Sequence, residues 1–323
     1  MAFIFDEFQS FMIWGVLMLH QQVRQDVRKG IFWSAVASCL WGVSGNLMQF
    51  VSQNEAVSTQ WFISFRTLFA GVVLLIIGYF QVGKHIFDPL RKRNLGRLLI
   101  YSIFGIGMNM STFYIAIQSG NAAMATILQY LAPMFIALYA FVFKRVRPSG
   151  GDAIAFAVAL IGVLLAVTKG NFHQLSIPLI AIIFGLLSAV SAGVYYAEPK
   201  PLMNDNSPIV ILGWGTLITS IFSNLYSPVW VEVPKITPGL ILGITGVIII
   251  GTIIAFSCML YSLRFTSGQT SSIVDAIEPV ATFVISVLAF HTSFNWVEIV
   301  GSLLVIVSVY LLQAFNKQKH VNA

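Results

Sequence analysis

Three charged residues lie deep inside apolar stretches of this chain, away from the ends of those stretches: Arg66, Asp275 and Glu278. A charged side chain at membrane depth costs about 3 kcal/mol on insertion scales, so it must face protein or water and is by default a functional candidate. Asp275 and Glu278 are spaced to share one face of a helix, and Ser271 and Ser272 extend that polar face by a turn. Such carboxyl groups can bind a cation or carry a proton.

A second polar stripe runs along an earlier apolar stretch at helical spacing, and it consists of Thr126, Gln129, Tyr130 and Pro133. Pro279 directly follows Glu278, and proline disfavours helical geometry in the residue before it and frees a carbonyl one turn earlier. We therefore expect Pro133 and Pro279 to bend two helices beside a central cavity. Asn46 and Asn109, on two other apolar stretches, are expected to add polar lining.

Each of these residues also has a structural interpretation that the sequence leaves open. Arg66 either contacts a solute, forms a salt bridge with Glu278 across roughly 8 Å of depth, or joins helices and reaches to the interface. Asp275 and Glu278 either carry a proton or face the cavity without a mechanical role. Gln129 and Tyr130 either bind a solute or hydrogen-bond a neighbouring helix. Separate from these, Trp41, Trp61 and Trp296 are expected as interfacial anchors.

The residue types needed for common catalytic chemistry are not arranged for it. The chain has no helix with the histidine and carboxylate spacing of a zinc site, no glycine-rich phosphate loop and no nucleophile elbow. Its two cysteines, Cys39 and Cys258, lie in apolar stretches and are expected as small hydrophobic residues. We therefore expect no enzyme activity, no cofactor and no metal.

The composition places the chain in a lipid bilayer. Of its 323 residues, 57% are hydrophobic and only 9% are charged, and the mean hydropathy is +0.84. This is too little polar surface to cover a soluble globule of that size. The net charge of +6 lies in short loops between apolar stretches, as it does in membrane proteins, so no nucleic-acid partner is expected.

Ten apolar stretches are each about long enough to cross a hydrocarbon core of ~30 Å. They lie near residues 30–50, 61–80, 98–117, 121–143, 151–168, 176–196, 208–227, 239–263, 269–290 and 296–315. With ten spans, most of the 18 lysines and arginines fall on one side: Arg24, Arg28, Lys29, Lys84, Arg91, Lys92, Arg93, Arg97, Lys144, Arg145, Arg147, Lys200, Arg264, Lys317 and Lys319. Only Lys169 and Lys235 fall on the other side, and Arg66 lies within a span. The positive-inside bias then places both termini in the cytosol.

Ten spans divide into five plus five, and two like halves with an odd number of spans insert in opposite orientations. At an ungapped offset of 146 residues, matching landmarks coincide: Gly105 with Gly251, Ser111 with Ser257, Pro133 with Pro279, and Asp152 with Glu298. We therefore predict an all-α membrane protein of ten transmembrane helices in two inverted five-helix repeats, residues 30–168 and 176–315. Residues 1–29 are expected as a cytosolic or interfacial segment, with Met18 as an alternative start, and 316–323 as a cytosolic tail.

Three stretches carry a resemblance to a known family: Arg66 to Gly71, Asn121 through Pro133 to Lys144, and Ser271 through Glu278 and Pro279 to Leu312. Together they resemble EamA-type members of the drug/metabolite transporter superfamily, over about residues 30–315. The resemblance implies ten helices in two inverted repeats, and the movement of small organic solutes, such as amino acids and related metabolites, by alternating access.

These observations favour a secondary transporter in the cytoplasmic membrane, an exporter of small organic metabolites, because ionisable residues lie in a span and no nucleotide-hydrolysis motif is present. Glu278 and Asp275 are the candidate coupling or amine contacts, and Arg66 is the candidate counter-ion or carboxylate contact. The alternative is a channel or a non-transporting membrane scaffold whose polar stripes only hold helices together. The sequence leaves open the solute, the direction, the coupling ion and whether the chain forms a homodimer.

Overall fold

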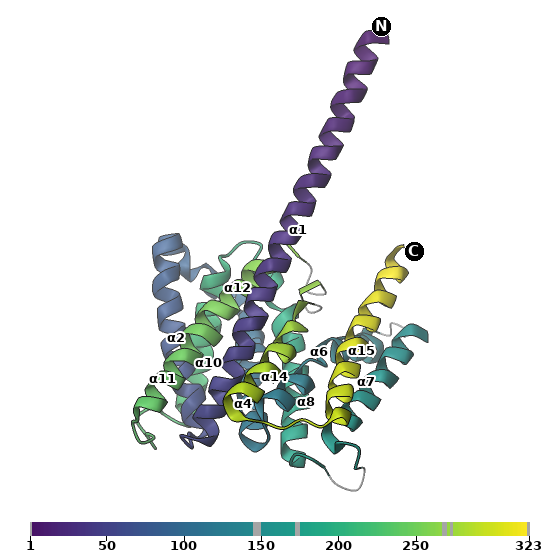
Figure 1. Ribbon diagram of the computed structural model, residues 1–323. Helices are drawn as coiled ribbons and strands as arrows, with labels where there is room; N and C mark the ends of the chain where they lie inside the picture. The colour runs from purple at the N-terminus through teal and green to yellow at the C-terminus, as the bar shows by residue number, and fades with distance from the viewer. Residues whose placement is uncertain (1, 145–149, 172–174, 267–269, 272–273, 322–323) are drawn as a thin grey trace.

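The computed structural model describes residues 2–144, 150–171, 175–266, 270–271 and 274–321, and every regular element in these ranges is helical (Figure 1). The chain begins with α1 (Ala2–Gln53), α2 (Thr59–Val82), η1 (Gly83–Leu90), α3 (Lys92–Ile100), η2 (Tyr101–Gly107), α4 (Met108–Ser119), α5 (Ala122–Gln129), α6 (Ala132–Lys144), α7 (Gly150–Thr168) and α8 (Leu179–Ala197). It continues with α9 (Pro199–Leu202), α10 (Pro208–Tyr226), α11 (Pro238–Gly246), η3 (Val247–Ile254), α12 (Ala255–Ser262), α14 (Ile277–Phe290) and α15 (Trp296–Val321).

Eight helical segments in the described ranges are long and apolar enough to cross a membrane. They are Val27–Gln53, Thr59–Leu90, Lys92–Ser119, Ala122–Tyr139, Gly150–Thr168, Leu179–Ala197, Pro208–Tyr226 and Pro238–Ser262. Two further apolar helices, Ile277–Phe290 and Trp296–Leu312, are shorter. These ten segments follow the ten predicted stretches in order, but only eight have the length of a span, so the ten-span count stays a prediction.

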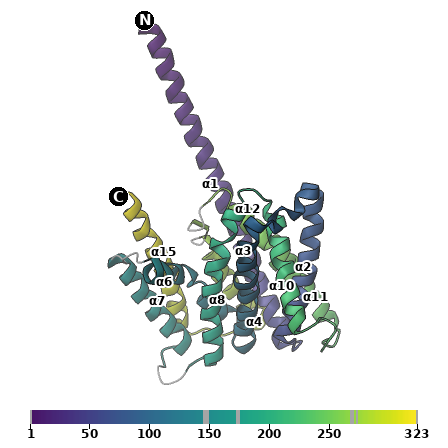
Figure 2. The same cartoon turned by 180° about the vertical axis from the view of Figure 1, so that it is seen from behind.

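Both ends of the chain emerge on the same side of the bundle (Figure 1). The N-terminal part of α1 projects beyond the other helices, and the two opposite views agree on this (Figures 1 and 2). The interfacial or cytosolic character predicted for residues 1–29 stays a prediction.

Helix pairs from distant parts of the sequence form the bundle. The main pairs are α7 with α15, α2 with α10, α4 with α8, α1 with α14 and with α12, and α5 with α8. In the α7–α15 pair, the two backbones touch: a Cβ added at Gly301 would lie 2.5 Å from the backbone nitrogen of Ala166. Glycine at Gly301 and Gly162 therefore permits this close approach, as small residues do between membrane helices.

Two of the predicted apolar stretches, 121–143 and 269–290, are interrupted by a short turn. The first breaks at a turn formed by Tyr130 and Leu131, between α5 and α6, and the other breaks at Asp275 and Ala276, before α14. Pro133 lies in the first turn of α6 and Pro279 in the first turn of α14. Proline is tolerated there because the amide it lacks would have no partner inside the helix. Each helix is interrupted a few residues before its proline, whereas Glu278, directly before Pro279, is itself helical.

Two π-helical segments lie inside long helices. Segment η2 leads into α4, and segment η3 leads from α11 into α12. A π-helical turn leaves backbone carbonyls open to partners other than the helix itself, and such turns are often found at functional sites. Here Thr219 donates to the carbonyl of Ser102 in η2 (2.6 Å), and Trp41 donates to the carbonyl of Gly251 in η3 (3.1 Å).

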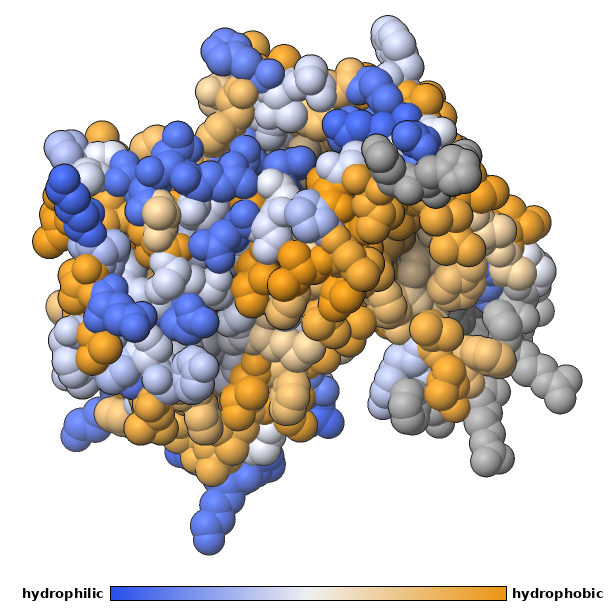
Figure 3. Space-filling model, turned by 90° about the horizontal axis from the view of Figure 1, so that it is seen from below, coloured by the Kyte–Doolittle hydropathy of each residue, from blue (hydrophilic) through white to orange (hydrophobic). Residues whose placement is uncertain are grey.

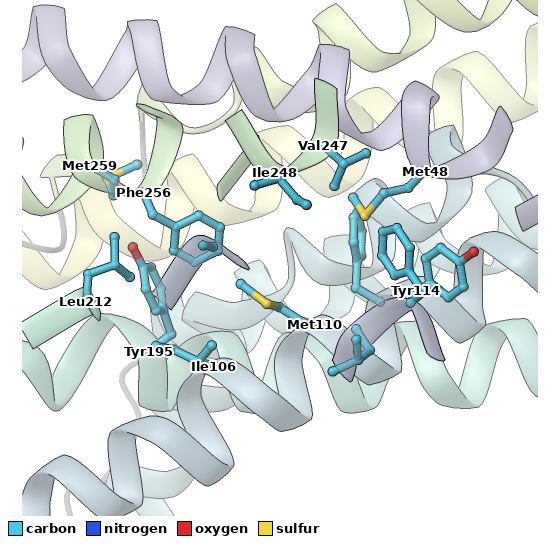
Figure 4. Close-up of a cluster of buried hydrophobic side chains, with 14 of the residues drawn as sticks. Met48, Ile106, Met110, Tyr114, Tyr195, Leu212, Val247, Ile248, Phe256 and Met259 are labelled. Carbon is cyan, nitrogen blue, oxygen red and sulfur yellow. The ribbon is translucent and has the colours of Figure 1, made fainter. Parts of the chain in front are cut away.

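The largest buried cluster joins both halves of the chain at the centre of the bundle. In Figure 4, Met110 lies between Phe256 and Met48, with Tyr195 on the Phe256 side. Many large apolar side chains are instead exposed on the outside, among them Phe80 and Leu242, as is expected where lipid is the solvent. Seen from the side opposite the termini, hydrophobic residues also cover much of the surface (Figure 3).

Candidate functional site

A cavity lies between the two broken helices, and both halves of the chain contribute to it. Its walls come from α1, α2, α4, α5, α6, α8, α12 and α14 and from the two turns that interrupt the broken helices. The lining residues are Trp41, Met48, Arg66, Asn109, Met110, Phe113, Thr126, Gln129, Tyr130, Ala132, Pro133, Ala192, Tyr195, Tyr196, Phe256, Asp275 and Glu278. The predicted central cavity therefore contains all three of the intramembrane ionisable residues.

Arg66 enters the cavity from α2 and is almost completely buried, with 3% of its surface exposed. Its Nε donates to Oγ1 of Thr252 on η3 at 2.7 Å, and its Nη1 lies 3.3 Å from the sulfur of Met48. The guanidinium carbon also lies 5.9 Å from the centre of the Phe62 ring. Within the described residues it forms no ion pair, so the predicted salt bridge with Glu278 is not present in this conformation.

Asp275 lies in the turn before α14 and joins three helical segments. Ser38 of α1 contacts its Oδ1 at 2.6 Å, and the hydroxyl of Tyr196 of α8 contacts its Oδ2 at 2.5 Å. Both carboxyl oxygens are therefore engaged, and the residue is 7% exposed.

Glu278 lies in the first turn of α14, three residues beyond Asp275, and also lines the cavity. Its carboxyl group has no hydrogen bond or ion pair to the part of the chain that the structure describes. Counting partners only among the described residues, the cavity thus holds one engaged carboxyl group, one unengaged carboxyl group and one arginine without an anionic partner.

Most of the other predicted residues also line the cavity. Thr126, Gln129, Tyr130 and Pro133 do so from the first broken helix, and Asn109 does so from α4. The amide of Asn109 donates to the carbonyl of Ser188, which fixes its orientation toward α8, and the hydroxyl of Thr126 donates to the carbonyl of Ala122. The amide side chain of Gln129 is therefore the neutral polar group best placed to contact a solute.

The remaining predicted residues lie away from the lining. Asn46 of α1 donates to the carbonyl of Thr282 and accepts from Ser286, so it clamps α1 to α14. Ser271 is fully buried in a cluster of hydroxyl groups that includes Thr266. Pro279 is buried in α14 without reaching the cavity surface, and Ser272 lies outside the described residues.

The aromatic part of the wall was missed by the sequence prediction, and for Trp41 the prediction was wrong. Trp41 lines the cavity and donates to the carbonyl of Gly251, so it is not an interfacial anchor. It packs edge-on against Tyr195 and Phe256, with ring centres 6.3 and 5.0 Å away. A buried indole needs an acceptor, and the π-helical turn of η3 supplies one. Two adjacent tyrosines, Tyr195 and Tyr196, end the sixth predicted apolar stretch, and this feature of the sequence could have predicted an aromatic wall.

The arrangement suits a solute with both polar and apolar parts. A guanidinium can pair with a carboxylate or phosphate, a carboxyl group can pair with an amine, and the wall of Trp41, Tyr195, Phe256 and Met110 can pack against an apolar portion. Metal binding has no comparable basis: no group of three histidine, cysteine, aspartate or glutamate residues in the described part of the chain is close enough to hold an ion.

The chain matches the model of the EamA-like transporter family twice, over residues 28–168 and 179–313. It is 32% identical to the uncharacterized inner membrane transporter YicL of Salmonella typhimurium over 296 residues, which cover 90% of this chain and 97% of that protein. It is 24% identical to the uncharacterized transporter YrdR of Bacillus subtilis over 308 residues, covering 88% of this chain and 91% of that protein.

A probable sugar phosphate/phosphate translocator of Arabidopsis thaliana is also similar, at 25% identity over 215 residues, which cover 62% of this chain and 51% of that protein. Among solved structures, a protein of known crystal structure matches with a TM-score of 0.60 over 90% of this chain and 98% of that one. Its sequence identity is 16%, so that match concerns the fold alone.

Proposed function

The chain belongs to the EamA-like transporter family and is a multi-pass membrane transporter rather than an enzyme, and we propose that it is a secondary transporter that exports small organic metabolites by alternating access. Amino acids and related compounds are the proposed solutes. The observation that carries this proposal is the cavity between two broken helices, which combines Arg66, Glu278 and an aromatic wall. Sites of this kind, at the interface of two halves, are typical of secondary transporters.

Two inverted repeats are part of the proposal, and the match of one family model to both halves supports them. The offset of 146 residues relates the starts of η2 and η3, Tyr101 and Val247, and the starts of α7 and α15, Gly150 and Trp296. Helix contacts follow the same relation. Helix α4 packs on α8 as α12 packs on α1, α6 packs on α8 as α14 packs on α1, and the pairs α2–α10 and α7–α15 each relate to themselves.

Both termini are proposed to face the cytosol. Their emergence on one side of the bundle supports this, as does the basic segment of η1 and α3, which follows the end of α2 on that same side (Figures 1 and 2). In this segment Arg93 pairs with Asp205 and Arg97 pairs with Glu198, and the acidic partners precede α10. Basic residues beside spans remain on the cytosolic side during insertion.

Each charged group has a separate role in the proposed site. Arg66 receives the carboxylate of the solute, because its guanidinium is positioned by Thr252 yet has no anionic partner among the described residues. Glu278 receives the amine, because its carboxyl group is unengaged. The breaks at Tyr130 and at Asp275 allow the two bent helices to change angle while the solute is bound, since each break interrupts the rigid helix at the cavity.

Counterflow with purified protein in proteoliposomes tests the proposal. Vesicles loaded with an unlabelled amino acid take up the labelled form, and only a carrier shows exchange that is accelerated by solute on the far side. Acceleration by at least one member of an amino acid panel is the expected result. Flux without such acceleration identifies a channel, and flux equal to that of empty vesicles identifies a scaffold, and either result overturns the proposal. Export is tested separately, because cells that overexpress the chain should tolerate toxic amino acid analogues better than a deletion strain does.

Ligand-dependent protection of a cysteine gives an independent test. On a background in which Cys39 and Cys258 are replaced, Gln129→Cys places a thiol on the cavity wall. A bound solute should slow its alkylation. The matched control is Gln53→Cys, which lies at the end of α1 beside Gly120 and outside the cavity, and its alkylation should not change.

A further inference from the structure

The hydrogen bond between Arg66 and Thr252 determines which edge of the guanidinium a solute can reach. We propose that Thr252 is a positioning residue of the solute site: it holds the Nε–H edge of Arg66 against η3, so that the solute carboxylate is received by the terminal Nη1 and Nη2 groups alone. Thr252 is fully buried and lies outside the cavity lining, so it acts only through Arg66. This role rests on the proposed transport function, whereas the contact between the two side chains does not.

The direction of the Nε–H bond closes one of the two binding edges of Arg66. A guanidinium can bind a carboxylate with two parallel N–H groups, either Nε–H with one N–H of Nη2, on its side, or one N–H each of Nη1 and Nη2, at its end. In Arg66 the single Nε–H points to Oγ1 of Thr252 at 2.7 Å. Because Thr252 does not line the cavity, the side edge faces η3 rather than the solute.

The terminal edge stays open. Nη1 of Arg66 lies 3.3 Å from the sulfur of Met48, but it carries two N–H groups and retains one of them. The guanidinium carbon lies 5.9 Å from the centre of the Phe62 ring, which restrains the group on a third side. Counting only contacts to the described residues, the donors left for a solute therefore belong to Nη1 and Nη2.

The π-helical geometry of η3 directs the hydroxyl of Thr252 toward Arg66. Its Oγ1 donates to the carbonyl of Val247, five residues earlier, at 3.1 Å. Threonines in regular helices of this chain, such as Thr67 and Thr282, instead donate to the carbonyl four residues earlier. The shift by one residue follows from the wider π-helical turn. A hydroxyl that donates to Val247 still has lone pairs for the Nε–H of Arg66.

Segment η3 is itself fixed against the first half of the chain. Trp41 of α1 donates to the carbonyl of Gly251, the residue directly before Thr252, at 3.1 Å. A Cβ at Gly251 would overlap the side chain of Ser44, so α1 and η3 are in close contact at this point. Thr252 therefore holds Arg66 from a wall that does not move independently of α1.

A guanidinium held in this way favours a carboxylate over a carboxamide. The two oxygens of a carboxylate match the two N–H groups of the terminal edge, whereas a carboxamide offers one oxygen and an NH2 group that cannot accept. Without the oxygen of Thr252, the side chain of Arg66 is free to turn, and the solute must order it on binding. The rotamer freedom of an arginine corresponds to about 10- to 30-fold in affinity.

Equilibrium binding to the purified protein tests this role. The probes are the amino acid of the panel that gives the strongest counterflow and the amide of that amino acid. Thr252→Val keeps the shape of the side chain without its oxygen, and it should weaken the acid about 10- to 30-fold and the amide much less. Thr252→Ser retains the oxygen and should bind the acid as the wild type does. Thr216→Val is the matched control, because its fully buried hydroxyl bonds to carbonyls of its own helix, α10, and it should change neither affinity.

Three results of this experiment overturn the proposal. Equal weakening of the acid and the amide in Thr252→Val shows a structural role alone. Unchanged or tighter binding of the acid shows that the edge of Arg66 is not set by Thr252. Failure of Thr252→Ser to restore the affinity shows that the oxygen is not the group that matters.

Nitrogen-15 NMR of arginine-labelled protein decides the matter if Thr252→Val is not recovered. The signals of Arg66 are assigned by their loss in Arg66→Gln. Its Nε–H should exchange slowly with water in the wild type and in Thr252→Ser, and the acid should shift the Nη signals while the Nε–H stays protected. Exchange of the Nε–H as fast as that of the exposed Arg97 refutes the contact, and loss of Nε–H protection on binding refutes the terminal edge.

Failure of this proposal and failure of the proposed transport function are distinguishable. If no member of the panel is exchanged in counterflow, the transport function fails and the solute role of Thr252 fails with it, while the Nε–H exchange still reports the contact with Arg66. If a probe is exchanged but its affinity is unchanged in Thr252→Val, only the positioning role fails.

Discussion

Replacing Arg66 with glutamine should weaken the binding of solutes that carry a carboxylate and spare those that do not. The guanidinium is 3% exposed, its Nε is bonded to Thr252 at 2.7 Å, and no anion pairs with it among the described residues. Its remaining N–H groups are therefore available to a solute in the cavity. Glutamine retains a polar side chain of moderate length but has no charge.

The size of the effect follows from the bond that is lost. A hydrogen bond to a charged group contributes about 1.5–3 kcal/mol, and each ~1.4 kcal/mol is a factor of ten in affinity, so the dissociation constant should rise about 10- to 150-fold. The protein itself should not lose stability, because the variant removes a buried charge that lacks an anionic partner in the described structure. Thr252 keeps its own bond to the carbonyl of Val247 (3.1 Å).

The assay is equilibrium binding of an amino acid and of its amide to the purified protein, in the wild type and in Arg66→Gln. The difference between the two solutes isolates the contribution of the carboxylate, as a double-mutant cycle does. Arg97→Gln is the control, since Arg97 lies outside the cavity and 3.9 Å from Glu198, and it should change neither affinity. The reasoning fails if Arg66→Gln weakens the acid and its amide equally, or if it weakens neither.

Two further predictions concern helix contacts. Gly301→Ala should destabilise the α7–α15 pair by about 1–3 kcal/mol, because its Cβ would lie 2.5 Å from the backbone nitrogen of Ala166. The control is Gly96→Ala, which has open space around it and should not lower the melting temperature. Equal melting temperatures of the two variants would contradict this packing. Asn46→Ala should lower the melting temperature while leaving solute preference intact, because Asn46 clamps two helices, whereas Asn109→Ala should alter solute preference, because Asn109 lines the cavity. A change of preference in Asn46→Ala would contradict the assignment.

The broken helices could be predicted because their causes are local. Proline lacks an amide proton and restricts the residue before it, so Pro133 and Pro279 required some interruption in otherwise continuous apolar stretches. Polar residues at helical spacing identified the faces that line the cavity, and Gln129, Asp275 and Glu278 all line it. The position of each break, a few residues before the proline, was not predicted, because it depends on which backbone hydrogen bonds the turn can form.

Partners of the intramembrane charges could not be predicted, because they depend on which helices are neighbours. Depth along the helix made Glu278 the obvious counter-ion for Arg66, but a hydroxyl on η3 contacts the guanidinium instead. Likewise, no sequence pattern connects Ser38 with Asp275, since the two residues are 237 positions apart. A polar residue inside a span indicates a need for a partner, and only the packing shows which residue supplies it.

The two π-helical segments explain why those partners lie where they do. In η3, Thr252 and the carbonyl of Gly251 bond to Arg66 and Trp41 from the first half of the chain. In η2, the carbonyl of Ser102 accepts from Thr219 of the second half. Each half therefore holds the other at a site where the helix has irregular hydrogen bonding. A helix with such a segment can exchange partners at smaller cost than a regular one, because its carbonyls already bond outside the helix. The side chains that position the cavity wall are thus bonded to the two π-helical segments.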